Sequence, residues 1–322
     1  MPREVGKTMR AAAIARFGGP DVLKLRVLPV PVPDADEVLI AVHTAGVGGW
    51  DADIRAGWWP FGRPRFPIVL GTDGSGTIAA VGSSVGRFRR GQKVYAYMWN
   101  SSQGGFYAEY VAVPAENVAV VPEILDLRQA GALGTTGLTA LQGVDDALHL
   151  CKGQSVIIHG ASGGVGTLAV QFAKMRGARV LASASGNDGV ALTRTLGADM
   201  AVDGRHDDIA ARARQFTPRG ADAVLAFAGG QALTRCLDAL HLGGCLAYPI
   251  GVEPAPRKRA GIKVIAYDAV SGVREFHRLN RAVESARLHV PIAAVFPLDQ
   301  AAKAHKRVAE GHVLGKIVLR VG

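Results

Sequence analysis

The chain of 322 residues has few cysteines, few aromatic side chains and no long apolar run. Its three cysteines, Cys151, Cys236 and Cys245, show neither paired nor metal-type spacing, which argues against a disulfide framework and favours a reducing compartment. Glycine, threonine and charged residues interrupt every apolar stretch, so a membrane span is not expected. The segment from Met1 to Met9 lacks the apolar core of a secretion signal, so a cytoplasmic location is expected.

Acidic residues are in deficit, with 27 Asp and Glu against 37 Lys and Arg, a net charge of +10. Such an excess raises the question of a nucleic-acid partner. The basic residues are nevertheless spread along the chain, and the densest groups, at 87–90 and 257–259, stand beside glycine or proline in expected loops. The charge therefore favours solvated loops, and a nucleic-acid partner is not expected.

The most specific feature of the sequence is an apolar run that ends in a glycine turn and opens a helix. The run 155–159 leads into Gly160, and further glycines follow at three-residue intervals. A β-carbon on such a turn would obstruct a pyrophosphate, whereas the free N–H groups of the following helix attract one. The pattern predicts a dinucleotide site. We assign to it Gly160, Ser162, Gly163, Gly164, Val165 and Gly166.

Strand-like runs recur after this turn, at 179–184, 200–202, 223–226, 245–248 and 262–265, with helical patterns between them. This alternation is typical of an α/β fold with a doubly wound parallel sheet. The chain before Pro122 is instead mostly β, with runs such as 37–43 and 76–81. We expect a β-rich domain over 1–122, a dinucleotide-binding domain over 123–266, and a return to the β-rich domain over 267–322 through a helix at 273–288 and a strand at 316–320. The substrate is expected in the cleft between the domains.

Several motifs together resemble the medium-chain dehydrogenase/reductase superfamily, in its zinc-free quinone oxidoreductase (zeta-crystallin-like) branch. They are 17–23, 51–57, 67–76, 134–140, the glycine turn, 196–199 and 311–318, which span nearly the whole chain. The resemblance implies a Rossmann domain inserted into a GroES-like domain. It also implies a homodimer.

The places at which zinc-dependent members of the superfamily carry metal ligands are empty in this sequence. Gly48 stands in place of a cysteine, Thr72 and Asp73 replace a His-Glu pair, and 131–134 offers no ligand. The cysteine-rich lobe of those enzymes is also missing, since 98–107 contains no cysteine. Because a catalytic zinc needs about three protein ligands, a metal-free mechanism is expected.

Without a Lewis acid, reduction of a conjugated acceptor is easier than oxidation of an alcohol, because conjugation spreads the charge left by hydride addition. We therefore expect hydride transfer to small-molecule quinones or α,β-unsaturated carbonyls. No acidic residue ends the run 179–184, which favours NADPH over NADH. Ser183, Ser185 and Asn187 are expected near the adenosine phosphate, with charge from Arg205, although Ser185 or Asn187 can equally serve as a helix cap.

Catalytic roles are harder to predict from this sequence. Asp51 and Arg55 match the superfamily pattern, while the Asn and Pro that precede them there are replaced by glycine. We expect Asp51, Arg55 and Thr135 to orient the substrate. The alternative for Asp51 and Arg55, which stand four residues apart, is an ion pair within one helix.

The tryptophans gather in two segments, with Phe61 among them. They predict either a stacking wall for a planar substrate or ordinary core packing. The expected substrate-pocket residues are Trp50, Trp58, Trp99 and Tyr107. By resemblance, Gly229, Ile250 and Gly251 back the nicotinamide ring, whereas His43 and His159 lie in strand-like runs and are expected to be packed.

Two other functions fit the sequence. One is a metal-free NADP-dependent alcohol or secondary-metabolite dehydrogenase with the same fold. The other is a zeta-crystallin-like protein that binds NADPH and RNA and has weak catalysis, for which the positive charge is the main support.

Overall fold

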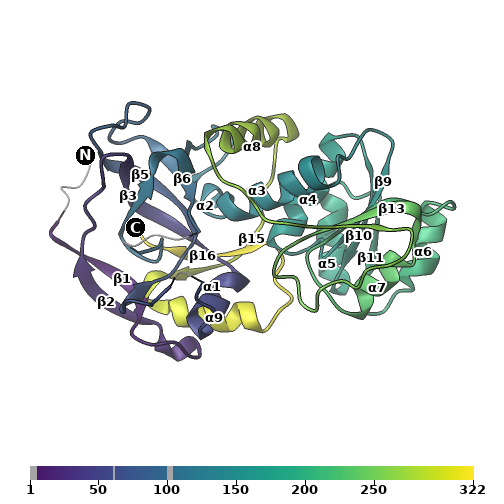
Figure 1. The fold of residues 1–322 in the computed structure, drawn as a ribbon, viewed down its shortest axis with the longest axis horizontal. Coiled ribbons are helices and arrows are strands. Elements are labelled where there is room, and N and C mark those ends of the chain that lie inside the picture. The colour runs from purple at the N-terminus through teal and green to yellow at the C-terminus, as the bar shows by residue number, and fades with distance from the viewer. Residues whose placement is uncertain (1–5, 61, 100–103) are drawn as a thin grey trace.

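A computed structural model describes residues 6–60, 62–99 and 104–322 of the chain (Figure 1). Phe61 lies outside this part. Figure 1 shows a β-rich body built from the N-terminal and C-terminal segments, beside an α/β body built from the middle of the chain. No helix in the described part is long and apolar enough to cross a membrane.

The β-rich body is organised around the long strand β3 (Glu37–Val47), which pairs antiparallel with β5, β7 and β16. The other strands are β1 (Thr8–Ile14), β2 (Lys24–Pro29), β4 (Ile68–Val69), β5 (Asp73–Val81), β6 (Lys93–Tyr97), β7 (Tyr110–Pro114), β8 (Val118–Val120), β15 (Ile292–Pro297) and β16 (Lys316–Arg320). Two helices, α1 (Gly49–Ala56) and α9 (Ala301–Ala309), pack beside them. The pairing of β16 with β3 returns the end of the chain to this body, where Val318 lies opposite Gly46.

The α/β body holds a sheet of six parallel described strands in the order β11-β10-β9-β12-β13-β14. These strands are β9 (Ser155–His159), β10 (Arg179–Ala184), β11 (Met200–Asp203), β12 (Ala221–Ala226), β13 (Leu240–Pro249) and β14 (Lys263–Tyr267). Its helices are α3 (Gly134–Gln142), α4 (Gly164–Met175), α5 (Gly186–Thr195), α6 (Ile209–Phe216), α7 (Gln231–Leu237) and α8 (Val273–Ala286), whereas the short helix α2 (Leu127–Ala130) packs against β3, β5 and β6 of the β-rich body. The expected doubly wound parallel sheet beside a β-rich domain is confirmed. The strand order reverses between β9 and β12, which is where such sheets bind ligands.

Both faces of this sheet are buried, which explains why its strands are continuously apolar. Val156 and Ile158 of β9 point into one core with Leu168 and Phe172 of α4, while Ile157 between them points into a second core with α6 and α7. Because neighbouring side chains of a strand alternate between faces, a run of consecutive apolar residues is needed to cover both. The glycine turn at the end of β9 is thus carried by a rigid, fully packed strand.

The two bodies meet directly at the glycine turn. The Gly315 N–H donates to the Ser162 carbonyl over 2.8 Å, and Gly163 forms a bridge with Gly315. β16 begins at the next residue, so the first side chain of that strand lies beside the start of α4. This contact joins the predicted dinucleotide site to the β-rich body.

Candidate functional site

The glycine turn has the geometry that an anion site requires. Gly160 adopts a φ of +76°, and a β-carbon on Gly166 would collide with the backbone of Gly160 and Ala161. α4 begins after Gly163 without a side-chain cap, so the N–H groups of its first turn have no side-chain acceptor. Ser162, Gly164 and Val165 complete the turn. The structure therefore brings the six predicted turn residues together around one uncapped helix start.

A lysine that the sequence analysis missed lies next to this helix start. Lys316 is buried, and its aliphatic chain lies 3.4 Å from the position of a β-carbon added to Gly164. Its ammonium group is 4.4 Å from the centre of the Trp50 ring, and no described carboxylate lies within ion-pair distance of it. A buried cation without an ion-paired acid is costly, and Asp51 acts on this ammonium only from beyond ion-pair distance. Together with the helix start, Lys316 suits a negatively charged group in the position of a cofactor pyrophosphate.

Four side chains form a buried hydrogen-bonded chain behind the site. The Arg55 guanidinium lies 3.0 Å from His305 Nδ1, His305 Nε2 lies 3.1 Å from the Tyr107 hydroxyl, and that hydroxyl donates to Asp51 Oδ2 over 3.3 Å. Because arginine only donates, Nδ1 of His305 accepts and Nε2 carries the proton. Each group therefore donates to the next, and the chain ends on the Asp51 carboxyl.

Burial controls the protonation of two members of this chain, Asp51 and His305. Burial, with the nearby Asp73 adding repulsion, raises the pKa of Asp51 to about 7 despite the N–H of Gly48, which donates to Oδ2 over 2.7 Å. Burial and the adjacent Arg55 lower the pKa of His305 to about 3. A neutral imidazole thus stands between a permanent cation and a carboxyl poised near neutrality.

Arg55 does not form the ion pair within one helix that was one expectation for this pair. Its Nε donates to the Gly18 carbonyl over 3.0 Å and its other end contacts His305, so it ties α1 to the N-terminal segment and to α9. Asp51 points instead to Tyr107 and to the start of its own helix. The four-residue spacing fails here because both side chains are buried against different neighbours.

Thr135, which is expected to orient the substrate, makes its hydrogen bond to Asp73 through its backbone. The Thr135 N–H donates to Asp73 Oδ2 over 3.1 Å. Three buried atoms nearby have no hydrogen-bond partner in the described part of the chain: Asp51 Oδ1, Asp73 Oδ1 and Thr135 Oγ1. Buried polar atoms without a hydrogen-bond partner are rare in folded proteins, and a group of them is typical of a functional site.

The residues expected at the adenosine end separate into two groups. Ser183 is buried and its hydroxyl contacts His159 Nδ1 at 3.2 Å, so Ser183 belongs to the packed sheet. Ser185 lies at the surface and contacts His312 Nδ1 at 2.9 Å, and His312 Nε2 lies 3.0 Å from Asp188. Asn187 and Arg205 are exposed nearby. His312 comes from the segment before β16, and no local sequence signal connects it with Ser185.

The residues expected behind the nicotinamide lie at the ends of β12 and β13. A β-carbon on Gly229 would crowd the backbone carbonyls of 253 and 254, so this glycine allows a close approach of two chain segments. Ile250 is exposed, and Gly251 has a φ of +98°. His159 is packed as expected, and burial lowers its pKa to about 4. This imidazole is therefore neutral at physiological pH.

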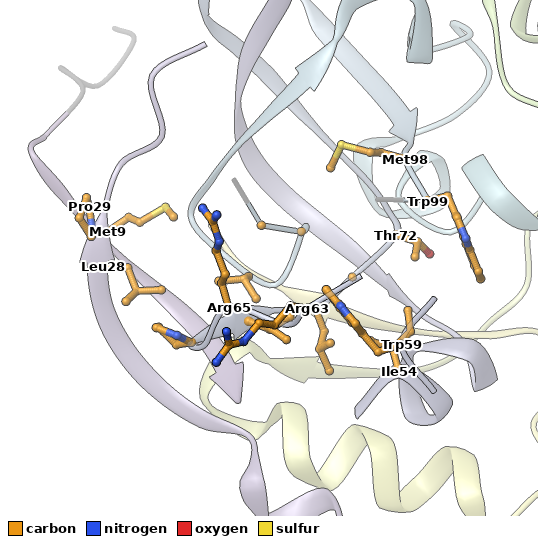
Figure 2. A pocket seen from close by; sticks show the side chains of 17 residues that line it. Met9, Leu28, Pro29, Ile54, Trp59, Arg63, Arg65, Thr72, Met98 and Trp99 are labelled. Atoms are coloured by element: carbon orange, nitrogen blue, oxygen red, sulfur yellow. The ribbon is translucent and has the colours of Figure 1, made fainter. Parts of the chain in front are cut away.

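A cavity of about 610 Å³ lies in the β-rich body (Figure 2). Of the four residues expected in the substrate pocket, Trp99 lines it. Trp58 packs edge-on against Trp99 with ring centres 5.8 Å apart, and Trp50 donates to Thr72 Oγ1, which does line the cavity. Tyr107 is fully buried, which corrects its expected place in the pocket wall: its ring packs beside His305.

The metal positions inferred from the resemblance hold hydrogen-bonded side chains. Thr72 accepts from Trp50 over 2.7 Å, and Asp73 accepts from Thr135. A β-carbon on Gly48 would collide with the Trp50 ring. In the residues that the structure describes, no group of three His, Cys, Asp or Glu side chains is arranged to hold a metal ion.

Comparisons with known proteins agree with this fold. Residues 34–123 match the alcohol dehydrogenase GroES-like domain, and residues 196–319 match the zinc-binding dehydrogenase model. The chain is 31% identical to the quinone oxidoreductase of Mus musculus, over 97% of this chain and 98% of that protein. It is 30% identical to the chloroplastic NADPH-dependent alkenal/one oxidoreductase of Arabidopsis thaliana, over 98% of this chain and 80% of that protein.

A solved structure described as an NAD-dependent alcohol dehydrogenase superimposes with a TM-score of 0.90 at 33% identity, covering 98% of this chain and all of that one. The identity to full-length relatives, together with the two domain matches, establishes the family. The chain is an oxidoreductase that belongs to the medium-chain dehydrogenase/reductase superfamily, in its quinone oxidoreductase branch.

Proposed function

We propose that this protein reduces quinones or α,β-unsaturated carbonyl compounds with NADPH, without zinc. The observation that carries the proposal is that the side chains at the metal-ligand places are hydrogen-bonded to other residues of the protein: Thr72 accepts from Trp50 Nε1, and Asp73 Oδ2 accepts from the Thr135 N–H. Relatives named as quinone and alkenal/one oxidoreductases support the substrate class.

The glycine turn, the start of α4 and Lys316 would hold the cofactor pyrophosphate. The turn leaves room for it, since a β-carbon on Gly163 or Gly164 would have no neighbour closer than 3.4 Å, and Lys316 supplies a buried positive charge that lacks a carboxylate within ion-pair distance in the described residues. When bound, the reduced nicotinamide supplies the hydride. Its ring would lie near Gly229 and Gly251 at the ends of β12 and β13, where a β-carbon on Gly251 would have no neighbour within 4 Å.

Thr72 is the group that we expect to orient the acceptor. Its oxygen accepts from Trp50 Nε1 over 2.7 Å, so its own proton is available for a substrate oxygen in the cavity that it lines. Hydride addition to the β-carbon of an enone leaves negative charge on the carbonyl oxygen, and a hydrogen bond from Thr72 would stabilise that charge. Water would supply the proton that completes the reduction.

NADPH rather than NADH is proposed because Ser185, His312 and Arg205 gather at the adenosine end. Two acidic side chains lie close to this group and both have partners: Asp188 is paired with His312, and Asp203 accepts from the Arg205 N–H over 3.0 Å. An unpaired acid at this place would repel a 2′-phosphate. The structural relative named as NAD-dependent makes the cofactor ratio a necessary measurement.

The test is the initial rate of NADPH and NADH oxidation by chelator-treated protein, with an ortho-quinone and a 2-alkenal as acceptors. We expect turnover that added Zn²⁺ does not raise, and a preference for NADPH. Thr72→Val keeps the shape of the side chain and removes the donor, so kcat should fall about tenfold to a hundredfold. Thr195→Val, on the exposed side of α5, is the matched control. Activity that requires stoichiometric zinc would refute the proposal.

A second candidate is a metal-free alcohol dehydrogenase, which the 33% identity to the structure named as an alcohol dehydrogenase favours. Oxidation of an alcohol needs a base that accepts its proton. Asp51, with its pKa raised to about 7 by burial, is the carboxyl closest to that requirement. Turnover of alcohols with NADP⁺, abolished in Asp51→Asn, would favour this candidate over the reductase.

A further inference from the structure

The cavity in the β-rich body is large enough for a small organic molecule and has two unlike ends. Its volume of about 610 Å³ lies in the range of small-ligand sites. Figure 2 shows Met9, Leu28 and Pro29 on one side, Thr72 and Trp99 on the opposite side, and Arg63 and Arg65 between them. Every lining residue falls between positions 9 and 105, so the wall contains nothing from the parallel sheet.

The charged side chains that line the cavity are all positive. Arg63 and Arg65 are its charged side chains, and no described acidic residue or lysine lines it. Both are exposed, and neither forms an ion pair with an acid in the described part of the chain. Several other arginines do: Arg10 pairs with Glu109, Arg176 with Asp145, and Arg259 with Asp238. Guanidinium groups that line a cavity without an ion-paired acid favour an oxyanion, which arginine binds through paired N–H donors.

The rest of the lining is apolar and aromatic. Trp59 and Trp99 stand on the wall with Ile54, Leu70 and Met98. A planar conjugated ligand buries its faces well against such side chains. The cavity therefore combines a surface for a flat apolar body with one cationic edge.

The end of the cavity at Thr72 connects to the expected pyrophosphate position through three contacts. Thr72 accepts a hydrogen bond from Trp50, the Trp50 ring lies under the ammonium of Lys316, and Lys316 runs past Gly164 at the start of α4. Thr72 thus lines the cavity and is linked through these contacts to the expected pyrophosphate position. The arginines lie elsewhere on the wall, away from the dinucleotide turn.

We propose that the physiological substrate is a conjugated ketone, aldehyde or quinone that carries an oxyanion, such as a carboxylate, and that the guanidinium group of Arg63 or of Arg65 binds this oxyanion while the carbonyl lies at Thr72. This inference rests on the proposed function, whose site it deepens by naming the substrate class. Each charge-assisted hydrogen bond is worth roughly tenfold or more in affinity when it is well formed. Since both guanidinium groups are exposed to solvent, we expect the two together to raise the affinity for the oxyanion about tenfold.

The probes are (E)-3-benzoylacrylic acid and its methyl ester, which share one enone and differ in the charge. Their saturated analogues, 3-benzoylpropanoic acid and its methyl ester, measure binding by calorimetry without any hydride transfer. The variants are Arg63→Gln with Arg65→Gln together, and Arg219→Gln as an exposed control on the other body. Wild-type protein should bind the saturated acid about tenfold more tightly than the ester and show the same preference in kcat/KM. Added salt should weaken the preference.

The outcomes separate the two proposals. Equal binding of acid and ester in the wild-type protein, or a preference that survives in the double arginine variant, overturns the oxyanion site whether or not turnover occurs. Tight binding of the acid without reduction of either enone supports the oxyanion site and contradicts the proposed reductase. Loss of the preference in Arg219→Gln would mean that the effect is a general one of net charge, and would also overturn the assignment.

Discussion

Asp51→Asn tests whether the carboxyl at the end of the buried chain is protonated in the folded protein. Asp51 is fully buried, and its Oδ2 accepts from Gly48 N–H and from the Tyr107 hydroxyl. An asparagine oxygen can accept the same two bonds, while its amide would occupy the place of the unpartnered Oδ1. The substitution therefore changes the ionisation of the site with little change in its shape.

The magnitude follows from the raised pKa. Burial raises the pKa of Asp51 from 3.8 to about 7, so the unfolded chain releases this proton near pH 4 and the folded protein keeps it until near pH 7. Within that window the folded state binds more protons, and the free energy of unfolding falls by roughly 1.4 kcal/mol for each pH unit. The full effect is about 4 kcal/mol, absent below the lower pKa and complete above the higher one. Between pH 5 and pH 8 it amounts to about 3 kcal/mol.

The assay is urea unfolding of the wild-type protein and Asp51→Asn from pH 5 to pH 8, followed by far-UV circular dichroism. The difference between the two proteins isolates this carboxyl from all other titrating groups. The free energy of unfolding of the variant should rise by about 3 kcal/mol relative to that of the wild type as the pH rises from 5 to 8. Asp53→Asn, an exposed residue of the same helix, should show no such trend. A difference that stays constant from pH 5 to pH 8 would show that Asp51 is ionised in the fold and refute the reasoning.

Three further predictions concern the turn, the imidazole and the adenosine end. Gly166→Ala places a β-carbon against a backbone carbonyl of the same turn and should lower the free energy of unfolding by about 1–3 kcal/mol in thermal unfolding. Gly163→Ala, whose β-carbon would have its nearest neighbour 3.5 Å away, should lower it much less. Equal losses of stability in the two variants would contradict the close approach at Gly166. His305→Gln should make the protein less sensitive to acid, because burial lowers the pKa of this imidazole to about 3 and the stability that it contributes above pH 6.5 is lost as the pH falls. In urea unfolding at pH 7 and pH 4.5, the wild type should lose about 2 kcal/mol more than the variant, and the exposed His277→Gln is the control. Equal losses in the wild type and the variant would mean that His305 is protonated in the folded protein. Asp188→Asn removes the negative charge beside Ser185 and should raise the affinity for NADPH by a few-fold, with the affinity for NADH unchanged, in fluorescence titrations. An equal effect on both cofactors would mean that this site does not contact the 2′-phosphate.

Much of the fold was predictable because its signals are local. The bounds expected for β10, at 179–184, and for β16, at 316–320, agree with the structure. In both cases a short apolar run is flanked by glycine or polar residues, and the pattern of a strand is contained within it. The glycine turn was predictable for the same reason, because the backbone geometry of a tight turn limits which residues fit it.

The site was predictable only in part, because its contacts join distant segments. Local spacing suggested a pair between Asp51 and Arg55, but the structure connects them through Tyr107 and His305, which are 56 and 250 residues away from their partners. Lys316 had the appearance of an ordinary strand residue, and its place beside Gly164 follows from the pairing of β16 with β3.

The sequence by itself determined the parallel sheet, the glycine turn and the family, since each depends on hydrogen bonding and side-chain alternation within a few residues. Tertiary structure alone decided that Asp51 is buried next to Tyr107, that Lys316 lies beside the helix start, and that Arg63 and Arg65 line one cavity with Thr72. The physical reason is desolvation. The charge state and the partners of a polar side chain depend on which distant segments exclude water from it, and the residues adjacent in sequence do not specify those segments.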